Sequence, residues 1–378
     1  MHVPHFKNYK LAFSLFGFIL LSGCQVVSVK QQALNVTIAN ERDSILTRDK
    51  LSEASLNVLS MTGQEAKVCA LNTEQCLSDI QKTAQVPQEQ LYSTGSELYL
   101  AQAKALESTS ACKSKIKEVS SQNKKHIEKK QLRDQCLNAE IAMLDKSIRY
   151  SYAYLFRSNR PPQQRIFDNR QVQIRDFYNQ AIAKLISVYA LQYPNKNPHG
   201  KALPVGKSTY TIDFEHYPEL ANTPIEDHMS SYNLNFSGLR SINRRDGFGS
   251  EFVTILPKEK NAEENKYILD PLHHNFKNGI NPNIHQPRYL PTTLTIEPDA
   301  NTSTEDLLKD APMRVKVYDP YQYDTIQVGQ EKYPLAANFS APYGLWLAQN
   351  NLGKSAYLSL IDRDQNLTMP HLFMLEPY

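Results

Sequence analysis

The clearest helical pattern is KKQLRDQCLNAEIAMLDKSIRYSYAYLF, from Lys129 to Phe156, in a chain of 378 residues. Its apolar side chains recur at steps of three and four residues. They are Leu132, Cys136, Leu137, Ile141, Leu144, Ile148, Tyr152 and Leu155. Residues at this spacing share one face of an α-helix, so the pattern predicts a long amphipathic helix.

The surrounding residues extend this helical character over the first half of the chain. Only two of the 21 prolines precede residue 161, and only two glycines lie between residues 24 and 193. Proline and glycine interrupt helices, so their scarcity predicts a helical region. We expect helices over 44–61 and 88–107, and another that follows Pro161-Pro162 and ends before Pro194. Together these helices predict an α-helical bundle from 44 to 193.

The sequence changes character after a connector at 194–209, which is rich in proline, glycine and lysine. Short runs of β-branched and aromatic residues follow, at 210–214, 252–256, 292–296, 313–318, 345–347, 356–361 and 372–375. The run from Met313 to Val317 alternates apolar and polar residues, which gives a strand one buried and one solvated face. Because turn-rich segments separate the runs, we predict an antiparallel, β-sandwich-like domain over 210–378. The expected fold class is α+β, with the helices first and the strands second.

The charges of the chain nearly cancel, because 42 Lys and Arg stand against 39 Asp and Glu, a net charge of +3. The mean hydropathy of −0.50 excludes a multi-span membrane protein, while 41% hydrophobic residues supply sizeable cores. A basic run over 111–134 carries eight Lys or Arg and three acids. Anionic lipid head groups are one partner for such a run, but a solvated helix face is the commoner use. Since it lacks interleaved aromatic residues, we predict no nucleic-acid partner.

The first residues have the pattern of an export signal. A short basic start precedes an apolar run of eleven residues, Leu11 to Leu21, which is too short to span a bilayer. It ends in Leu21-Ser22-Gly23-Cys24, which resembles the lipobox of bacterial lipoprotein signal peptides. That resemblance implies a cleaved signal over 1–23, a lipid-anchored linker over 24–43, and acyl chains on Cys24 that bind a membrane. An ordinary cleaved signal with a chance cysteine is the alternative.

The residue after Cys24 bears on the location. Gln25 stands where an Asp would be the usual inner-membrane retention signal of such lipoproteins. The resemblance therefore implies the outer membrane, with the protein facing the periplasm or the cell surface.

Four further cysteines, Cys69, Cys76, Cys112 and Cys136, lie within one stretch of the helical half. An even number in an exported chain implies two disulfides, with three ways to pair them. We favour Cys69 with Cys76 and Cys112 with Cys136, because each bond then joins local neighbours. Without a C-x-x-C pair or a suitably spaced His, a zinc site is not expected, and we predict no metal and no cofactor.

The common catalytic signatures are missing from the sequence. No two glycines are four apart, as a nucleophile elbow requires, and no Walker loop occurs. Carboxylates stand beside His216 and His228, and Ser237 follows, so these residues could assemble a hydrolytic or metal site. Because such residues beside a Pro-rich loop are usually structural, we assign no catalytic residue.

The second half contains a cluster of charged residues, Arg244-Arg245-Asp246, followed by Gly247 and Gly249. Two guanidiniums beside flexible glycines could bind an anion. They could equally hold a turn against the sheet, which is the interpretation that we favour.

Several segments resemble the N-terminal, non-catalytic region of Gram-negative lipoprotein α/β hydrolases of the lipase and esterase kind. They are the lipobox, the segment 45–59, the helix through 150–156, SGLRSINRRDGFGSEFV at 237–253 and the ending PHLFMLEPY. In that family a helical and a β-rich region precede the catalytic domain. The resemblance implies that this domain would begin about where the chain ends, at Tyr378. It therefore implies an accessory module without its own hydrolase activity, whose partner is a separate α/β-hydrolase catalytic domain.

Two other hypotheses stay open at this point. The first is a free-standing binding or scaffold lipoprotein of the cell envelope. The second is an enzyme with an unrecognised site around His216, His228 and Ser237.

Overall fold

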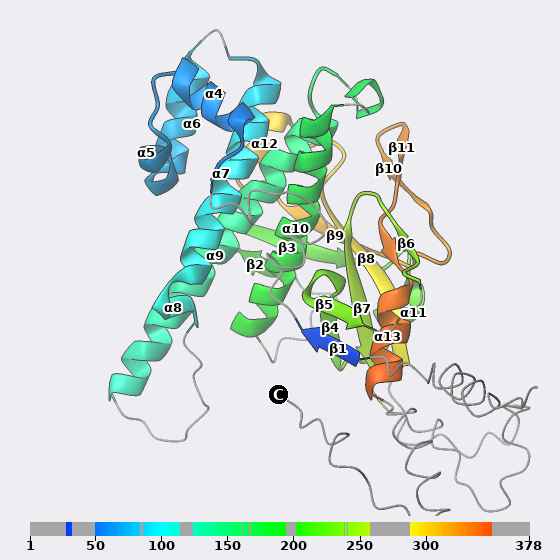
Figure 1. Cartoon of the computed structure of the whole chain (residues 1–378). Coiled ribbons are helices and arrows are strands. Elements are labelled where there is room, and N and C mark those ends of the chain that lie inside the picture. Colours follow the sequence, from blue (N-terminus) through cyan, green and yellow to red (C-terminus); the bar gives the residue numbers. More distant parts are fainter. Residues whose placement is uncertain are drawn as a thin grey trace, which may run out of the picture.

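The computed structural model describes residues 28–31, 50–83, 86–113, 124–160, 162–165, 168–193, 202–237, 239, 241–257 and 288–349, and its fold is mixed α+β (Figure 1). The α-helices are α4 (Glu53–Met61), α5 (Ala66–Leu71), α6 (Thr73–Lys82), α7 (Gln88–Ser108), α8 (Ser110–Lys113), α9 (Lys124–Phe156), α10 (Asn169–Gln192), α11 (Pro218–Ala221), α12 (Thr304–Leu308) and α13 (Ser340–Gln349), with 3-10 turns at Pro162–Arg165 and Ser231–Asn233. The strands are β1 (Ser28–Gln31), β2 (Leu203–Val205), β3 (Ser208–Asp213), β4 (Asp227–Ser230), β5 (Leu234–Ser237), β6 (Arg244–Arg245), β7 (Ser250–Leu256), β8 (Arg288–Pro298), β9 (Met313–Tyr318), β10 (Thr325–Val328), β11 (Glu331–Pro334) and β12 (Ala337–Asn338).

Three long helices, α7, α9 and α10, pack against one another and form a layer beside the sheet (Figure 1). Their positions confirm the helices expected over 88–107, through 129–156 and after Pro161-Pro162. α7 and α9 approach each other closely at Gly95, where an added Cβ would overlap the ring of Tyr150. The short helices α4, α5 and α6 cover α7 at one end of the molecule. Of the helix expected over 44–61, residues 53–61 form α4, and residues 44–49 lie outside the described residues.

A buried ion pair joins α4 to two of the long helices. The side chain of Glu97 on α7 is fully buried, and its Oε2 accepts a hydrogen bond of 2.8 Å from Arg170 on α10. The hydroxyl groups of Ser52 and Ser55 donate to the same carboxylate oxygen at 2.7 and 2.6 Å. A buried charge is tolerated only when it is paired and hydrogen-bonded, so these groups fix how the three helices meet.

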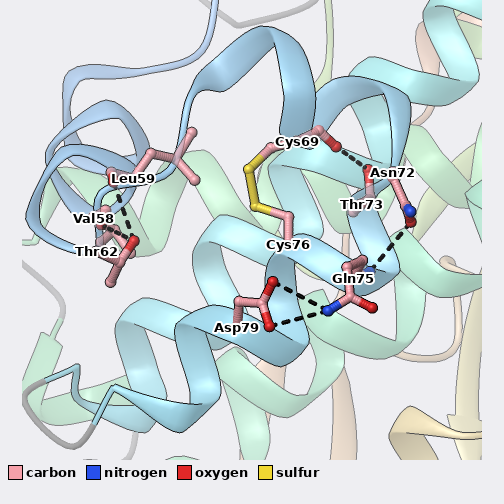
Figure 2. The surroundings of a disulfide bond; sticks show 9 residues. All are labelled: Val58, Leu59, Thr62, Cys69, Asn72, Thr73, Gln75, Cys76 and Asp79. Atoms are coloured by element: carbon pink, nitrogen blue, oxygen red, sulfur yellow. Dashed lines mark hydrogen bonds between the residues drawn. A yellow bond between two sulfur atoms is a disulfide. The ribbon is translucent and has the colours of Figure 1, made fainter.

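Two disulfides lie in the helical half, and they follow the favoured pairing. Cys69 is bonded to Cys76 and Cys112 to Cys136, with Cα atoms 5.2 and 5.4 Å apart, within the usual range for a disulfide. Figure 2 shows the first bond, which links α5 to α6 across Asn72. The Thr73 hydroxyl donates to the Cys69 carbonyl at 2.9 Å beside it. The bond therefore fixes a tight helix–turn–helix corner.

The main sheet has six strands in the order β2-β3-β9-β8-β7-β4. β3 and β9 run parallel, and the other neighbours are antiparallel. Phe252 on β7, Leu294 and Ile296 on β8 and Val315 on β9 belong to the same buried cluster as the residues of α9 and α10. One face of the sheet is thus covered by helices.

The opposite face is covered over β7 by α13 and β5. Val253 and Ile255 on β7 pack there with Leu234, Ala341 and Leu345 in a smaller apolar cluster. The expected strands at 210–214, 252–256, 292–296 and 313–318 lie in β3, β7, β8 and β9. The expected strand at 345–347 is wrong, because these residues belong to α13. A short apolar run does not reveal its periodicity, and Asn338 caps this helix by accepting from the Ala341 N–H at 3.0 Å.

The prediction of a sandwich following a separate helical bundle is not confirmed. A sandwich needs two extended sheets packed face to face, but helices cover one face of this sheet and α13 with the two-stranded β1–β5 sheet covers the other over β7. The β3–β9 pair is also parallel rather than antiparallel. One cluster of buried side chains also runs across the connector expected at 194–209, of which residues 203–205 form β2. The expected strands at 356–361 and 372–375 lie outside the described residues.

Candidate functional site

Arg245 of the predicted anion cluster is used to hold a loop. β6, which consists of Arg244 and Arg245, pairs with β12. The guanidinium of Arg245 donates to the Leu335 carbonyl at 2.8 Å, to the Tyr323 carbonyl at 2.8 Å and to the Pro320 carbonyl at 3.4 Å. These bonds tie the segment that follows β9 to β6, as expected for a turn lock.

Arg244 points to a different partner. Its Nε donates to Oε1 of the buried Glu251 on β7 at 3.0 Å, and its guanidinium lies 5.1 Å from the centre of the Tyr232 ring. The next residue, Asp246, interacts within the protein as well. The geometry around Arg244 and Arg245 therefore favours the structural interpretation over an anion site.

The glycines after this cluster allow helix α10 to bind the backbone directly. The Asn179 amide donates to the Gly247 carbonyl at 2.9 Å, and its oxygen accepts from the Gly249 N–H at 2.8 Å. Gly249 has a φ of 99°, a conformation that side-chain-bearing residues rarely adopt. A Cβ on Gly247 would overlap the backbone of residues 334–336. The glycines are therefore required for close packing.

His228 on β4 faces the helix-covered side of the sheet. Its Nδ1 lies 2.8 Å from the Thr254 hydroxyl, which in turn lies 2.9 Å from the Thr292 hydroxyl. The imidazole stacks on Phe252 with ring centres 4.4 Å apart. Burial lowers the pKa of His228 to about 4. The ring is thus neutral near pH 7 and acts as part of the packing.

His216 lies elsewhere, against two tyrosines beyond β3. Its ring centre is 4.4 Å from that of Tyr318 and 5.0 Å from that of Tyr323. Tyr318 pairs with Thr293, whose side chain points to the face of the sheet opposite Thr292. β9 and β4 are three inter-strand steps apart, about 14 Å at 4.8 Å per step. His216 and His228 therefore lie on opposite faces and do not form one site.

Ser237 is the third residue of the hypothetical hydrolytic site. Ser237 is the last residue of β5, where it pairs with Ser28 of β1. Within the described part of the chain, no group of three or more His, Cys, Asp or Glu residues is arranged to hold a metal ion.

The basic run over 111–134 lies partly outside the described residues. Its described ends belong to α8 and to the start of α9, which the Cys112–Cys136 bond holds together. The side chains of residues 127–130 are exposed. This exposure fits a solvated helix face.

The feature that remains is the β1–α13 face, which we define as β1, β5 and α13. β1 begins only four residues after Cys24 and pairs antiparallel with β5, from Ser28 opposite Ser237 to Gln31 opposite Leu234. α13 packs beside both strands (Figure 1). The stretch predicted as a linker over 24–43 therefore contains a strand. Cys24 itself lies outside the described residues.

The outer side of α13 is aromatic. Ala341 and Leu345 are buried beneath the helix, whereas Tyr343 is 55% exposed and Trp346 is partly exposed. The two rings stack with their centres 6.0 Å apart and their planes 24° from parallel. None of the ten residues of α13 is charged. Sequence reasoning missed this feature because it assigned 345–347 to a strand.

Comparison of the chain with family models, with curated proteins and with solved structures finds no match. Among the described residues, no helix is both long and apolar enough to span a bilayer.

Proposed function

We propose that this chain is a lipoprotein of the bacterial cell envelope, anchored in the outer membrane by acyl chains on Cys24. The observation that carries the proposal is the apolar run that ends in Leu21-Ser22-Gly23-Cys24. Several acyl chains, each gaining about 0.8 kcal/mol per buried methylene, anchor a folded body stably without a spanning helix. The body would face the periplasm or the cell surface.

The two disulfides support an exported protein. Cys69–Cys76 and Cys112–Cys136 use all the cysteines that follow Cys24. Disulfides form and persist in oxidising compartments such as the periplasm and are rare in the cytosol. Cys24 is then left for modification, as the lipobox requires.

We further propose that the body is a non-catalytic accessory module for a separately made α/β-hydrolase domain. The support is the resemblance of the segments at 45–59, 150–156 and 237–253 to the region that precedes such domains. The separation of His216 from His228 also argues against the rival hydrolytic site. A free-standing envelope scaffold is the second candidate, and it is favoured by the large buried cluster that joins helices and sheet into one body.

The anchor is tested by fractionating the native host and measuring the mass of the N-terminal peptide. We expect a peptide that begins at Cys24 and carries acyl chains, and we expect Cys24→Ala to remove the protein from the membrane fraction. Gln25→Asp is the matched control, since it keeps the acylated cysteine and moves the protein to the inner membrane. An unmodified Cys24, or a Cys24→Ala chain that stays membrane-bound, would contradict the proposal.

The accessory role is tested by cross-linking in native membranes followed by purification of the full chain. Recovery of an α/β hydrolase, together with no ester hydrolysis by the chain alone, supports the module. Recovery of the chain without any hydrolase favours the scaffold. Ester hydrolysis that is lost on His216→Ala would restore the enzyme hypothesis.

A further inference from the structure

We propose that Tyr343 and Trp346 on α13 form a second membrane contact, at the level of the lipid head groups beside the acylated Cys24. This inference rests on the proposed lipid anchor. It adds a side of the folded body that touches the same bilayer, and therefore a fixed orientation of the body on the membrane.

The first step is the short distance between the anchor and the folded body. Three residues separate Cys24 from Ser28, the first residue of β1. An extended chain covers at most about 3.6 Å per residue, so the two Cα atoms lie within about 14 Å of each other. With its acyl chains inserted, Cys24 lies at the bilayer surface. The end of β1 is therefore held close to the head groups.

The second step is the position of α13 relative to β1. α13 packs directly on β1 and β5, and Figure 1 shows it beside the β1 arrow. A tether of about 14 Å is short compared with the helical layer, whose longest member, α9, has 33 residues and a length of about 50 Å. The anchor therefore brings the β1–α13 face, rather than the distant α4–α6 end, toward the bilayer.

The third step is the chemistry of the exposed side of α13. Tyr and Trp rings have an apolar body and a polar edge, and they concentrate at the interface between hydrocarbon and water. Tyr343 is 55% exposed and stacks on Trp346. A helix without any charged residue inserts at this level without having to remove a charge from water.

The exposed aromatic side of α13 contacts the bilayer rather than a protein partner, because its surface is small. Aromatic residues bury at most about 250 Å² each, so the pair offers about 500 Å². A stable protein interface needs roughly 800 Å² on each side. Two rings beside an acyl anchor are, however, sufficient to orient a body that is already held at the membrane.

The test uses Trp346 itself, since it is the only tryptophan of the chain. The full acylated chain is reconstituted into vesicles of phosphatidylethanolamine and phosphatidylglycerol, and its tryptophan emission is recorded with lipids brominated at shallow or deep acyl positions. We expect emission at shorter wavelength than for the chain in detergent-free solution without acyl chains, and stronger quenching by the shallow bromines than by the deep ones. Emission and quenching equal to those of the free chain would overturn the inference.

The control moves the reporter to the other end of the molecule. Leu71 on α5 is 84% exposed, and α5 lies far from β1 (Figure 1). In a chain with Trp346→Phe and Leu71→Trp, we expect no quenching by either lipid. Equal quenching at both positions would indicate non-specific adsorption and would refute a fixed orientation.

A second preparation separates this inference from the lipid anchor. The chain from residue 24 with Cys24→Ala is attached through an N-terminal histidine tag to vesicles that contain a nickel-chelating lipid. Quenching of Trp346 in this state supports the contact even if native Cys24 proves unmodified. Acylated Cys24 together with unquenched Trp346 would leave the anchor in place and refute the contact.

Discussion

The hydroxyl of Tyr178 makes the hydrogen bonds to central strand β8 that a neighbouring strand would otherwise make. The variant Tyr178→Phe measures how much these bonds contribute to stability. β7 begins at Ser250, opposite Leu294, so Ile296 on β8 has no partner on that side. The Tyr178 hydroxyl donates to the Ile296 carbonyl at 2.8 Å and accepts from the Ile296 N–H at 3.0 Å. One oxygen atom on α10 thereby satisfies two backbone groups of a central strand.

The expected loss follows from these two bonds. Tyr178 is 1% exposed, so water does not reach the groups that the variant leaves unpaired. Each buried group without a partner costs about 1–3 kcal/mol, and the two together about 2–6 kcal/mol. The ring and its packing are kept in Tyr178→Phe, so the loss reports on the hydrogen bonds alone.

The same helix offers a matched control. The hydroxyl of Tyr189, three turns further along α10, is buried without a hydrogen-bond partner. Tyr189→Phe should therefore leave the free energy of unfolding unchanged or raise it slightly. Urea unfolding of the two variants and the parent, followed by circular dichroism, gives the comparison. Equal losses for both variants would refute the role assigned to Tyr178.

Three further predictions concern burial and packing. Burial raises the pKa of Glu140 to about 7. The contribution of Glu140 to the free energy of unfolding is therefore complete below pH 4.5 and falls as the pH rises through 7. In urea titrations Glu140→Gln should have a free energy of unfolding up to about 3 kcal/mol above that of the parent at pH 8, and an equal one at pH 4. Burial lowers the pKa of His228 to about 4. The free energy of unfolding of the parent should therefore fall by up to about 1.4 kcal/mol per pH unit as the pH falls from 6.5 to 4. A melting temperature with the same pH dependence in His228→Gln would contradict this prediction. Gly95→Ala should cost about 1–3 kcal/mol, because its Cβ overlaps the Tyr150 ring; adding Tyr150→Leu should recover part of the loss, and no recovery would argue against the overlap.

The long helices and four strands of the main sheet, β3, β7, β8 and β9, could be predicted because their signals are local. α9 was found from apolar residues at steps of three and four, and β9 from the alternation of Met313 to Val317. The pairing of Cys69 with Cys76 was favoured from sequence separation alone and is present. In each case, neighbours in sequence are also neighbours in space.

The sandwich and the separate bundle are not confirmed, because both predictions depend on long-range contacts. The sequence does not reveal that Tyr178 binds β8, or that Arg149 on α9 donates to the Leu307 carbonyl, 158 residues away. The role of Arg245 was open for the same reason, since its acceptors are carbonyls 75 to 90 residues further along. The aromatic side of α13 was hidden because a run as short as 345–347 fits both a helix and a strand.

The hydrogen bonds from α9 and α10 to distant segments also determine when the helices can complete their folding. In the proposed export the helices reach the periplasm first, while the acceptors of Arg149, near residues 307 and 311, have still to cross the inner membrane. Until those residues emerge, the helical layer exposes the apolar surface that will later cover the sheet, a state prone to aggregation. Maturation of this protein should therefore depend on a periplasmic chaperone that shields the emerging helices, and depletion of such chaperones should lower its yield in the membrane fraction.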